Sequence, residues 1–325
     1  MLRLLSGIQP TGQMHLGNYF GAVKNWVHMQ EEYESFFMIA DLHALTTTYD
    51  APQHLKQCKH NLLIDLLSVG VNPEKAHIFY QSDIFEHSEL YVLLSMITPI
   101  SWLKRVPTYK DKLSESSNID PQNYGLLGYP VLQAADIMLY QTDVVPVGKD
   151  QLPHLELTRE IVRRFNLLYK TSFPLPNEVL TEFSVLPGLD GRKMSKSYGN
   201  TLPLSSSKED IDSKILKMVT DPNRVRLSDP GNPDVCPVFK YHILFTSSEK
   251  TQTISEECKS AKIGCVACKK QCAKSINDIL SPVRERHALF KDKTKLLDTI
   301  LLEGTSHAKK RARESMEKIR SAIGL

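Results

Sequence analysis

The first half of this chain alternates short apolar runs with amphipathic stretches. Apolar runs at residues 2–8, 35–40 and 77–80 predict strands, and the spacing of apolar positions over about 16–33 and 52–69 predicts helices between them. A strand, a helix and a second strand in this order form a βαβ unit, in which the strands are parallel and the crossover is right-handed. This half therefore predicts an α/β fold built around a parallel sheet.

The alternation is interrupted at about residues 84–128, where an amphipathic helix around 89–97 is followed by charged and polar segments. Beyond the interruption we expect a helix over 129–140, a strand at 144–147 and a helix over about 152–165. We interpret the interruption as an insertion that connects the two halves of a Rossmann-like nucleotide-binding sheet. The GxGxxG fingerprint of a dinucleotide site is absent from the sequence.

Helical patterns with polar faces continue from Lys208 to the end of the chain, apart from a loop rich in proline and glycine at 221–237. The last helix, over 307–323, has a basic face and an apolar stripe of Ala308, Ala312, Met316, Ile319 and Ile323. A chain of 325 residues is long enough for two domains. We expect a nucleotide-binding domain over 1–204 and an all-helical domain over 205–325.

The distribution of charge suggests a role for the helical end. The net charge of the chain is +3, but residues 201–325 carry 23 Lys+Arg against 16 Asp+Glu, which leaves the first 200 residues acidic. The basic end is either a face for nucleic acid or a solvated helical surface. No apolar run approaches the roughly 18 residues of a membrane span, and no signal peptide opens the chain. We therefore expect a soluble, cytoplasmic or processed organellar protein without a membrane partner, in which six cysteines do not form a disulfide framework.

Two short motifs carry candidate phosphate chemistry. Residues 190–197, which we call the lysine loop, place Arg192, Lys193 and Lys196 around serine hydroxyls, an arrangement suited either to a polyphosphate or to a solvated basic turn. Residues 10–18, which we call the glycine turn, enter the first predicted helix through glycines. A helix N-terminus reached in this way offers unpaired N–H groups to an anion.

A third candidate is a carboxylate in an apolar helix. Asp136 lies among leucine, isoleucine and alanine, so that its side chain must point outward or meet donors inside. Gln133 shares its helix face, and Tyr129 lies one turn earlier. His43, with Asp41 before it, follows the second predicted strand at the carboxyl edge of the sheet, where open α/β folds bind ligands.

Five short stretches of the chain form a set, namely GIQPTG at 7–12, HLGN at 15–18, GKDQ at 148–151, LELTR at 155–159 and KMSKS at 193–197. This set resembles the motifs of the class I aminoacyl-tRNA synthetases, and in particular those of the tryptophanyl branch. The resemblance spans nearly the whole chain. Asn18 replaces the second histidine of many class I members, as is usual in the tryptophanyl branch.

The resemblance implies an ATP-dependent, two-step aminoacylation that uses Mg²⁺, L-tryptophan and tRNA(Trp), carried out by a homodimer. Gln9, His15 and Asn18 would hold the α-phosphate and ribose, and Lys193 and Lys196 would stabilise the leaving pyrophosphate. The ATP-binding residues implied in this way are Gln9, Pro10, Thr11, Gly17, Asn18, Gly148, Lys149, Asp150, Leu186, Lys193, Met194, Ser195, Lys196 and Ser197. The connecting segment around 84–128 would form the dimer interface, with Trp102 and the apolar residues near 93–97 either at that interface or in the core. The helical domain would bind the anticodon.

The resemblance also implies a tryptophan pocket in which Asp136 accepts the indole N–H, because indole has one donor and no acceptor. The other expected wall residues are Leu5, Gly7, His43, Tyr129, Gln133, Val145 and Val147. Gln133 makes this wall more polar than the aliphatic version found in some relatives.

Four cysteines, Cys236, Cys258, Cys265 and Cys268, are separated by twenty-one, six and two residues, and the last two form a CxxC pair. Four thiolates suit a [4Fe–4S] cluster or tetrahedral Zn²⁺, and the alternative is a set of thiols without metal. A subset of the resembled family holds a [4Fe–4S] cluster with nearly this spacing. Cys272 could substitute as a ligand, and Cys58 is expected in the core of the other domain.

Three other functions stay open at this point. A tyrosyl-tRNA synthetase has the same fold and both signatures. A small HxGH nucleotidyltransferase would explain the glycine turn but needs neither the lysine loop nor a helical domain. A synthetase-like RNA-binding paralogue without catalysis would not need the intact lysines.

Overall fold

The computed structural model describes residues 1–50, 52–106, 123–180 and 186–325, of which the side chains of Asp150 and Ser197 are not described. The charged and polar segments predicted after the helix around 89–97 fall mostly outside these ranges. The chain forms two compact units, which are described separately. The sheet unit contains Met1–Gly12, Lys24–Glu182 and Lys293–Leu325, and the helical unit contains Gln13–Val23 and Phe183–Asp292.

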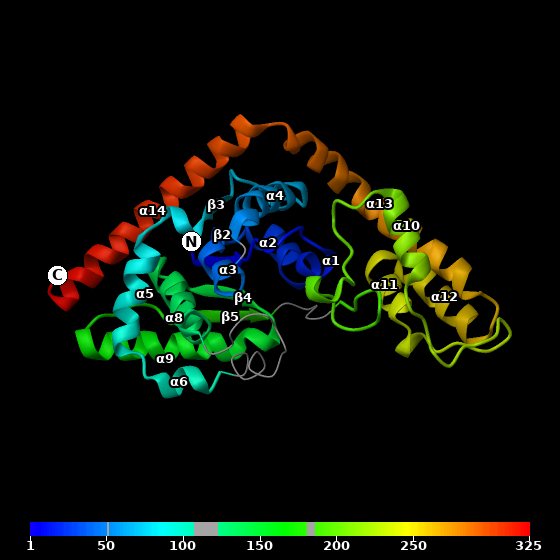
Figure 1. Cartoon of the computed structure of the whole chain (residues 1–325), viewed down its shortest axis with the longest axis horizontal. Helices are drawn as coiled ribbons and strands as arrows, with labels where there is room; N and C mark the ends of the chain where they lie inside the picture. Colours follow the sequence, from blue (N-terminus) through cyan, green and yellow to red (C-terminus); the bar gives the residue numbers. More distant parts are fainter. Residues whose placement is uncertain (51, 107–122, 181–185) are drawn as a thin grey trace. The chain divides into compact units, whose positions relative to one another are not determined.

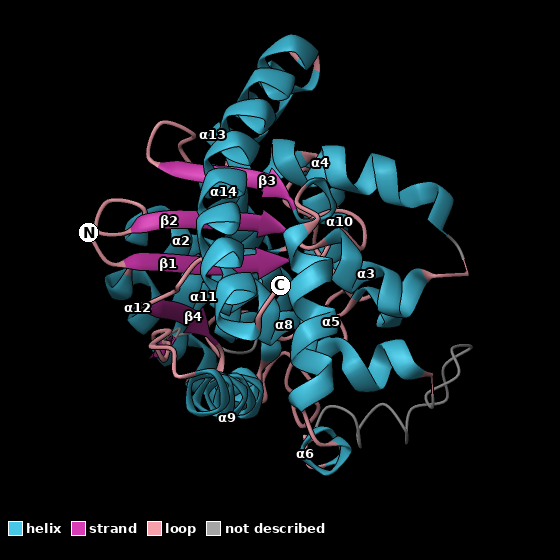
Figure 2. Ribbon diagram, turned by 90° about the vertical axis from the view of Figure 1, so that its left-hand side faces the viewer, coloured by secondary structure: helices cyan, strands magenta, loops and turns pink. Residues whose placement is uncertain are grey.

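The sheet unit is built on five parallel strands in the order β3-β2-β1-β4-β5, and the arrows of β1, β2 and β3 point the same way in Figure 2. The strands are β1 (Arg3–Ile8), β2 (Glu34–Ile39), β3 (Ala76–Tyr80), β4 (Val144–Val147) and β5 (Asn177–Leu180). The predicted α/β class with a Rossmann-like parallel sheet is confirmed. Because the strand order reverses between β1 and β4, the crevice at their carboxyl ends is the place where such a sheet binds ligands.

Helices cover this sheet, as Figure 1 shows. The helices of the sheet unit are α2 (Lys24–Met29), α3 (Asp41–Thr48), α4 (Leu55–Ser68), α5 (Glu86–Ile97), α6 (Ile100–Lys104), α8 (Tyr124–Leu139), α9 (Leu152–Tyr169) and α14 (Thr294–Ile323), with 3₁₀ turns η2 (Pro52–His54), η3 (Gln81–Asp83) and η4 (Lys149–Gln151). Helix α8 begins five residues earlier than predicted because the Asn123 side chain caps it, accepting from Leu126 N at 2.8 Å.

The last helix belongs to the sheet unit. The apolar stripe predicted near the C-terminus is buried, with Ala308, Ala312, Met316 and Ile319 in the same core cluster as residues of β1 and α8. Helix α14 runs along β3 and α5 (Figure 1), and the Arg320 guanidinium donates to the Glu89 carboxylate of α5. A single cut at residue 204 therefore does not separate the compact units, and the assignment of 205–325 to anticodon binding stays a prediction.

Backbone atoms of α14 lie directly against the edge strand. A Cβ built on Gly304 would stand 2.0 Å from the carbonyl oxygen of Ile78 in β3, and 2.8 Å from the nitrogen and carbonyl carbon of the same residue. Only glycine fits such an approach. The helix thereby covers the outer edge of β3, which would otherwise offer unpaired backbone groups.

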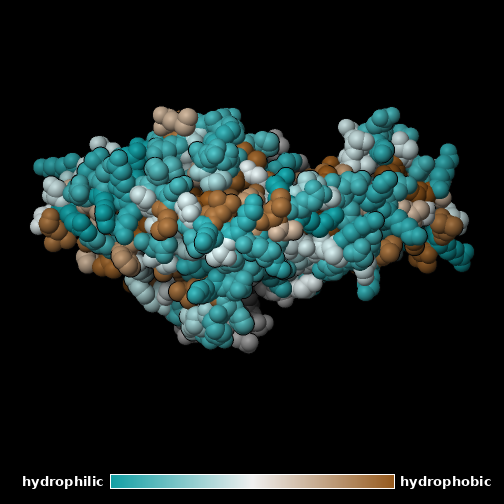
Figure 3. Space-filling model, turned by 90° about the horizontal axis from the view of Figure 1, so that it is seen from above, coloured by the Kyte–Doolittle hydropathy of each residue, from teal (hydrophilic) through white to brown (hydrophobic). Residues whose placement is uncertain are grey.

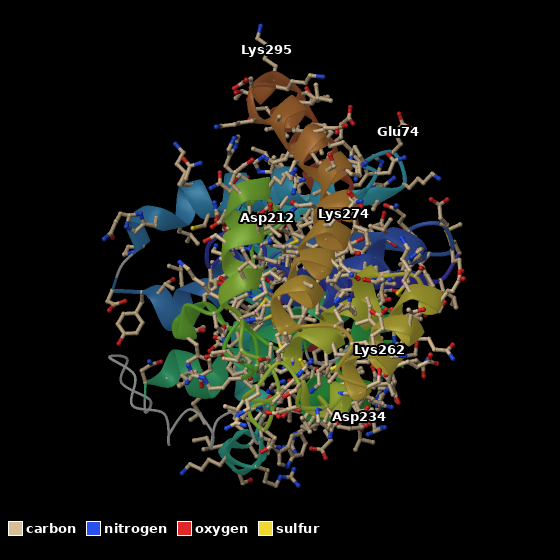
Figure 4. All side chains as sticks on the ribbon, turned by 90° about the vertical axis from the view of Figure 1, so that its right-hand side faces the viewer. Glu74, Asp212, Asp234, Lys262, Lys274 and Lys295 are labelled. Atoms are coloured by element: carbon tan, nitrogen blue, oxygen red, sulfur yellow. The ribbon has the colours of Figure 1, made fainter. Side chains whose placement is uncertain are left out.

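The helical unit consists of short helices around the long helix α13. Its elements are α1 (Leu16–Asn18), a π-helical turn (Tyr19–Val23), η5 (Lys196–Tyr198), α10 (Lys208–Lys217), η6 (Pro233–Val235), α11 (Pro237–Phe245), α12 (Ser248–Lys259) and α13 (Cys265–Lys291). Asn277 of α13 donates to Asp212 of α10 at 3.0 Å, and Figure 4 labels Asp212 and Lys274 on these two helices. The helix predicted over 16–33 forms as three successive pieces that end at Met29.

The face seen in Figure 3 is mostly hydrophilic, with scattered hydrophobic residues. Within the described ranges, no helix has both the length and the apolar composition that crossing a membrane requires.

Candidate functional site

The lysine loop is the tip of a short antiparallel reversal in the helical unit. Pro187 and Lys193 form an antiparallel bridge, and Met194 N donates to Leu186 O at 3.2 Å. Gly191 turns the chain with a φ of +84°, a conformation that strains any residue with a side chain. Lys193 is exposed at this tip, whereas Leu186 is buried below it.

Asn200 organises the lysine loop and was missed by the sequence analysis. Its Oδ1 accepts from Ser195 N at 2.8 Å, and its Nδ2 donates to Lys193 O at 3.1 Å and to Asp190 Oδ1 at 2.7 Å. The side chain is buried, so these bonds are shielded from water. An amide that directly follows Gly199 at the end of a loop is the signal that could have found it.

The glycine turn and the lysine loop meet within the helical unit through Gly17 and Met194, which lie 177 positions apart in the chain. Met194, between the two lysines, is buried, and its sulfur accepts from Gly17 N at 3.3 Å. Leu16 N donates to Leu202 O at 3.0 Å just beyond the loop. The two motifs singled out in the sequence therefore form one local structure.

His15 and Asn18 cap the first helix reciprocally. Asn18 N donates to His15 Nδ1 at 3.3 Å, and His15 N donates to Asn18 Oδ1 at 3.2 Å. Burial of the ring, followed by the positive charge of Lys196, lowers the pKa of His15 to about 4. His15 is therefore a neutral imidazole at neutral pH, and because Nδ1 accepts, its proton lies on Nε2.

In the sheet unit, the residues expected at ATP follow β1 and β4, which are neighbours through the pair Leu4 and Val144. Gln9 and Thr11 are exposed just beyond β1. Lys149 is exposed at the start of η4 beyond β4. Pro10 is buried, and Gly148 lies in the turn before η4. The sheet thus places the segment after β1 and the segment after β4 at the same carboxyl edge. The predicted contacts of Asp150 and Ser197 fall on side chains outside the described set.

Asp136 is 2% exposed and receives three hydrogen bonds from side chains of the sheet unit. Gln81 Nε2 lies 2.8 Å and His87 Nδ1 lies 2.6 Å from its Oδ1, and His43 Nε2 lies 2.7 Å from its Oδ2. Burial raises the pKa of this carboxyl, but the two histidines outweigh burial and the net pKa of Asp136 is lowered. An ionised carboxylate is therefore held inside the core.

One oxygen of the Asp136 carboxylate can still accept a hydrogen bond. Each carboxylate oxygen accepts about two hydrogen bonds. Oδ1 already receives two, whereas Oδ2 receives one, from His43, within the part of the chain that the structure describes. Oδ2 can therefore accept one further donor from a ligand.

The polar residues around Asp136 come from the carboxyl ends of β2 and β3. His43 N donates to Gln81 Oε1 at 3.3 Å, which ties α3 to η3. Asp41, at the start of α3, accepts from Ser82 N at 2.9 Å and pairs with Lys59. Gln81 could have been found from the sequence by the rule that selected His43, since it directly follows the third strand.

His87 carries a weaker signal in the sequence, because it lies just before the amphipathic helix predicted around 89–97. It is fully buried and links Asp136 to Tyr140, whose hydroxyl lies 2.8 Å from His87 Nε2. Neither His87 nor Tyr140 was predicted to belong to the site.

The other expected wall residues differ in their surroundings. Leu5, Val145 and Val147 are buried in the main core, Gly7 is exposed and Gln133 is half-buried. Tyr129 extends its hydroxyl to 2.6 Å from His154 Nε2, and the Tyr129 and His43 rings meet edge to face at 6.3 Å. Tyr129 and His43 are thus brought together, and His154 is a further polar partner that the sequence analysis missed.

The four cysteines of the predicted metal set lie close together in the helical unit. Burial, followed by the neighbouring thiols of Cys236, Cys258 and Cys265, raises the pKa of Cys268 to about 12. His242 Nε2 lies 3.4 Å from Cys268 Sγ. Cys272 is buried beside them, and Cys58 is half-buried. Among residues 1–50, 52–106, 123–180 and 186–325, no set of three or more potential ligands is arranged to hold a metal ion.

Residues 1–281 match the family described as tRNA synthetases class I (W and Y). The tryptophan–tRNA ligase of Thermotoga maritima is 49% identical over 326 residues, covering 100% of this chain and 99% of the relative, and that of Aquifex aeolicus is 41% identical with both chains fully covered. A crystal structure of tryptophanyl-tRNA synthetase from Campylobacter jejuni, complexed with ADP and tryptophan, superposes with a TM-score of 0.89 at 38% identity, covering 100% of both chains. The chain belongs to the class I tRNA synthetases for tryptophan and tyrosine, among the tryptophan–tRNA ligases.

Proposed function

We propose that this chain activates L-tryptophan with ATP to tryptophanyl-adenylate and then transfers the aminoacyl group to the 3′ end of tRNA(Trp), in the cytoplasm. The observation that carries the specificity is the buried, ionised Asp136 with one acceptor position left on Oδ2. Full-length similarity to tryptophan–tRNA ligases and to a synthetase complexed with ADP and tryptophan supports the substrate assignment.

The first step needs positioning more than proton transfer. The tryptophan carboxylate is already a nucleophile, so it attacks the α-phosphorus of ATP while pyrophosphate leaves. The protein then has to align the reactants and stabilise the charge that develops on the leaving group. Lys193 and Lys196 take this role in our proposal, and Mg²⁺ would share the charge on the phosphates.

The glycine turn would bind the α-phosphate and ribose. His15 suits this role as a neutral donor through Nε2, because its lowered pKa prevents it from adding a second positive charge beside Lys196. Gly17 and Asn18 lie at the N-terminus of α1, where Gly17 N donates to the Met194 sulfur. Gln9 would contact the same phosphate, with Pro10 and Thr11 beside it.

The remaining ATP contacts fall on three further groups. Gly148, Lys149 and Asp150 would bracket the nucleoside, and Leu186 would touch the adenine. Met194, Ser195 and Ser197 would support the lysines. These roles are proposals drawn from the family pattern.

Tryptophan recognition would place the indole N–H at Asp136 Oδ2. The apolar ring would pack against Leu5, Val145 and Val147, with Gly7 at the edge of the wall. Tyr129, Gln133 and His43 would complete the wall and hold the ammonium group. The phenol hydroxyl of tyrosine fits this pocket less well, because a hydroxyl group both donates and accepts hydrogen bonds and would need a donor beside it as well as the acceptor Oδ2.

Pyrophosphate exchange run separately with each amino acid tests the proposal. Exchange that depends on tryptophan supports it. Exchange with tyrosine instead would reassign the chain to tyrosine activation. No exchange with any amino acid, with tRNA binding retained, would leave a non-catalytic RNA-binding paralogue.

A homodimer would form through the α5 and α6 face. Of the residues predicted there, Leu94 belongs to the core and Leu93, Ile97 and Trp102 pack partly against it, whereas Met96 is 73% exposed. Ile100, on α6, is also exposed. Solvent-exposed apolar side chains on adjacent helices are suited to an interface. Light scattering of the protein and of a Met96→Glu variant tests this, and an unchanged mass would exclude this face.

The four cysteines would hold a [4Fe–4S] cluster or, as the second choice, Zn²⁺. The support for this donor set is the spacing of the four cysteines in the sequence, with Cys272 as an alternative ligand, because the described side chains are not arranged as a metal site. Basic residues flank the cysteines in the sequence, including Lys262 and Lys274, which Figure 4 labels, so a cluster there would stiffen a surface for the anticodon stem. Iron, sulfide and zinc analysis after anaerobic purification decides between the cluster, zinc and metal-free thiols.

A further inference from the structure

We infer that His87 and Tyr140 are positioning residues for tryptophan selection, acting through Asp136. This inference rests on the proposed function, in which Asp136 Oδ2 receives the indole N–H. It concerns two residues that would not touch the substrate and that the sequence motifs do not mark.

A hydrogen-bonded chain runs from Tyr140, the C-cap residue of α8, through His87 of α5 to Asp136 of α8. The Tyr140 hydroxyl lies 2.8 Å from His87 Nε2, and His87 Nδ1 lies 2.6 Å from Asp136 Oδ1. Tyr140 and His87 are 0% exposed and Asp136 is 2% exposed. A neutral imidazole with its proton on Nδ1 satisfies all three groups, because it accepts from Tyr140 and donates to Asp136.

This chain determines which part of the carboxylate faces a ligand. His87 and Gln81 together occupy both acceptor positions of Oδ1. Rotation of the carboxylate would break both bonds, so Oδ1 stays toward the core and Oδ2 keeps its remaining position. Tyr140 in turn keeps the His87 proton on the nitrogen that faces Asp136.

The surroundings argue against a simple core role. Phe36 packs on the Tyr140 ring at 4.9 Å and Phe79 stacks over His87 at 6.4 Å, so the chain is enclosed by aromatic residues. An apolar core needs no buried ion, and enclosing one is costly unless every partner is in place. The complete set of partners is explained if the carboxylate has to be presented in one orientation.

The test compares tryptophan with β-(3-benzothienyl)alanine, in which sulfur replaces the indole N–H. Pyrophosphate exchange is measured against each amino acid, and against ATP, for the wild type, His87→Leu, His87→Asn and Tyr140→Phe. We expect His87→Leu to raise the half-saturating tryptophan concentration by about 10-fold to 150-fold, the range for a hydrogen bond to a charged group. The half-saturating concentrations of the analogue and of ATP should change less than about twofold, because neither donates a hydrogen bond to Oδ2.

The two milder variants separate positioning from folding. His87→Asn keeps a donor near the Nδ1 position and should restore most of the tryptophan affinity. Tyr140→Phe removes only the hydroxyl and should raise the half-saturating tryptophan concentration by a smaller factor. This variant therefore tests the inference if His87→Leu does not fold.

The possible failures are distinguishable. Equal weakening of tryptophan and the analogue would show a structural role and overturn the inference. Variants that match the wild type for tryptophan would overturn it while leaving the proposed function intact. A wild-type protein that does not exchange with tryptophan would overturn the proposed function and this inference with it.

Discussion

Replacing Asp136 with asparagine turns one acceptor oxygen into a donor without changing the size of the side chain. Gln81 and His87 donate to Oδ1 and His43 donates to Oδ2. The amide oxygen should settle at the Oδ1 position, where it keeps two bonds, and the NH₂ group at the Oδ2 position. His43 can then move its proton to the other ring nitrogen, so that Nε2 accepts from the new amide.

The replacement of one oxygen by an NH₂ group determines the expected losses of folding stability and of tryptophan affinity. The fold keeps its number of hydrogen bonds but loses their ionic character, and we expect a loss of about 1–2 kcal/mol in the free energy of unfolding. At the ligand side, the indole N–H would meet an N–H in place of an acceptor. Loss of a hydrogen bond to a charged group costs about 1.5–3 kcal/mol, which corresponds to a roughly 10-fold to 150-fold weaker tryptophan interaction.

Pyrophosphate exchange with tryptophan and ATP varied in turn measures both effects, alongside urea unfolding. The half-saturating ATP concentration should stay unchanged. Asp143→Asn is the matched control, because that carboxylate accepts from Arg3 N at 2.8 Å and belongs to no part of the Asp136 cluster. An equal loss for tryptophan and ATP would show that Asp136 is structural, and an unchanged tryptophan dependence would remove it from the pocket.

Three further predictions concern the lysines, the last helix and pH. Lys193→Ala or Lys196→Ala should lower adenylate formation, measured by pyrophosphate exchange, by about 10²-fold to 10³-fold while calorimetry shows tryptophan binding nearly intact, since each lysine would stabilise charge on the leaving group. Gly304→Ala should destabilise the protein to urea by about 1–3 kcal/mol despite a gain of about 1 kcal/mol in helix propensity, because its Cβ would overlap the Ile78 carbonyl. The pKa of His15 falls from 6.5 to about 4 on folding, so the unfolded chain binds more protons than the folded chain between these pH values. The free energy of unfolding should therefore fall as pH drops from 6.5 to about 4, and it should fall less steeply in His15→Asn.

Matched variants separate these effects from general damage. Lys208→Ala removes an exposed lysine at the start of α10 and should leave exchange unchanged. Ser306→Ala raises helix propensity on the exposed side of α14 and should not destabilise the protein. Full exchange in both lysine variants, a stable Gly304→Ala protein, or identical pH profiles for wild type and His15→Asn would contradict the respective prediction.

The sequence predicted four of the five strands, because each is an apolar run bounded by polar residues. It missed β5, whose four residues are all exposed and include Asn177 and Glu178. This strand forms through backbone pairing with β4 and carries no hydrophobic pattern. The stripe on α14 was also predicted, but its partner was not, since a stripe of Ala308, Ala312 and Met316 fits any apolar surface.

The sequence alone identified the motif residues and the requirement of a buried carboxylate for hydrogen-bond donors. It indicated that the lysine loop and the glycine turn belong to one chemistry, and that Asp136 requires donors if it is buried. Local spacing carries this information because helices and turns form between residues close in the chain.

The identity of the partners was decided only by the tertiary structure. Asp136 is satisfied by side chains 93, 55 and 49 residues away, from His43, Gln81 and His87, and Met194 reaches Gly17 across 177 residues. No local pattern specifies such contacts, because they depend on which elements the sheet order and the packing of the core bring side by side. The sequence by itself therefore determined the parallel sheet and the residues that carry the chemistry, and the folded chain decided which of their atoms face one another.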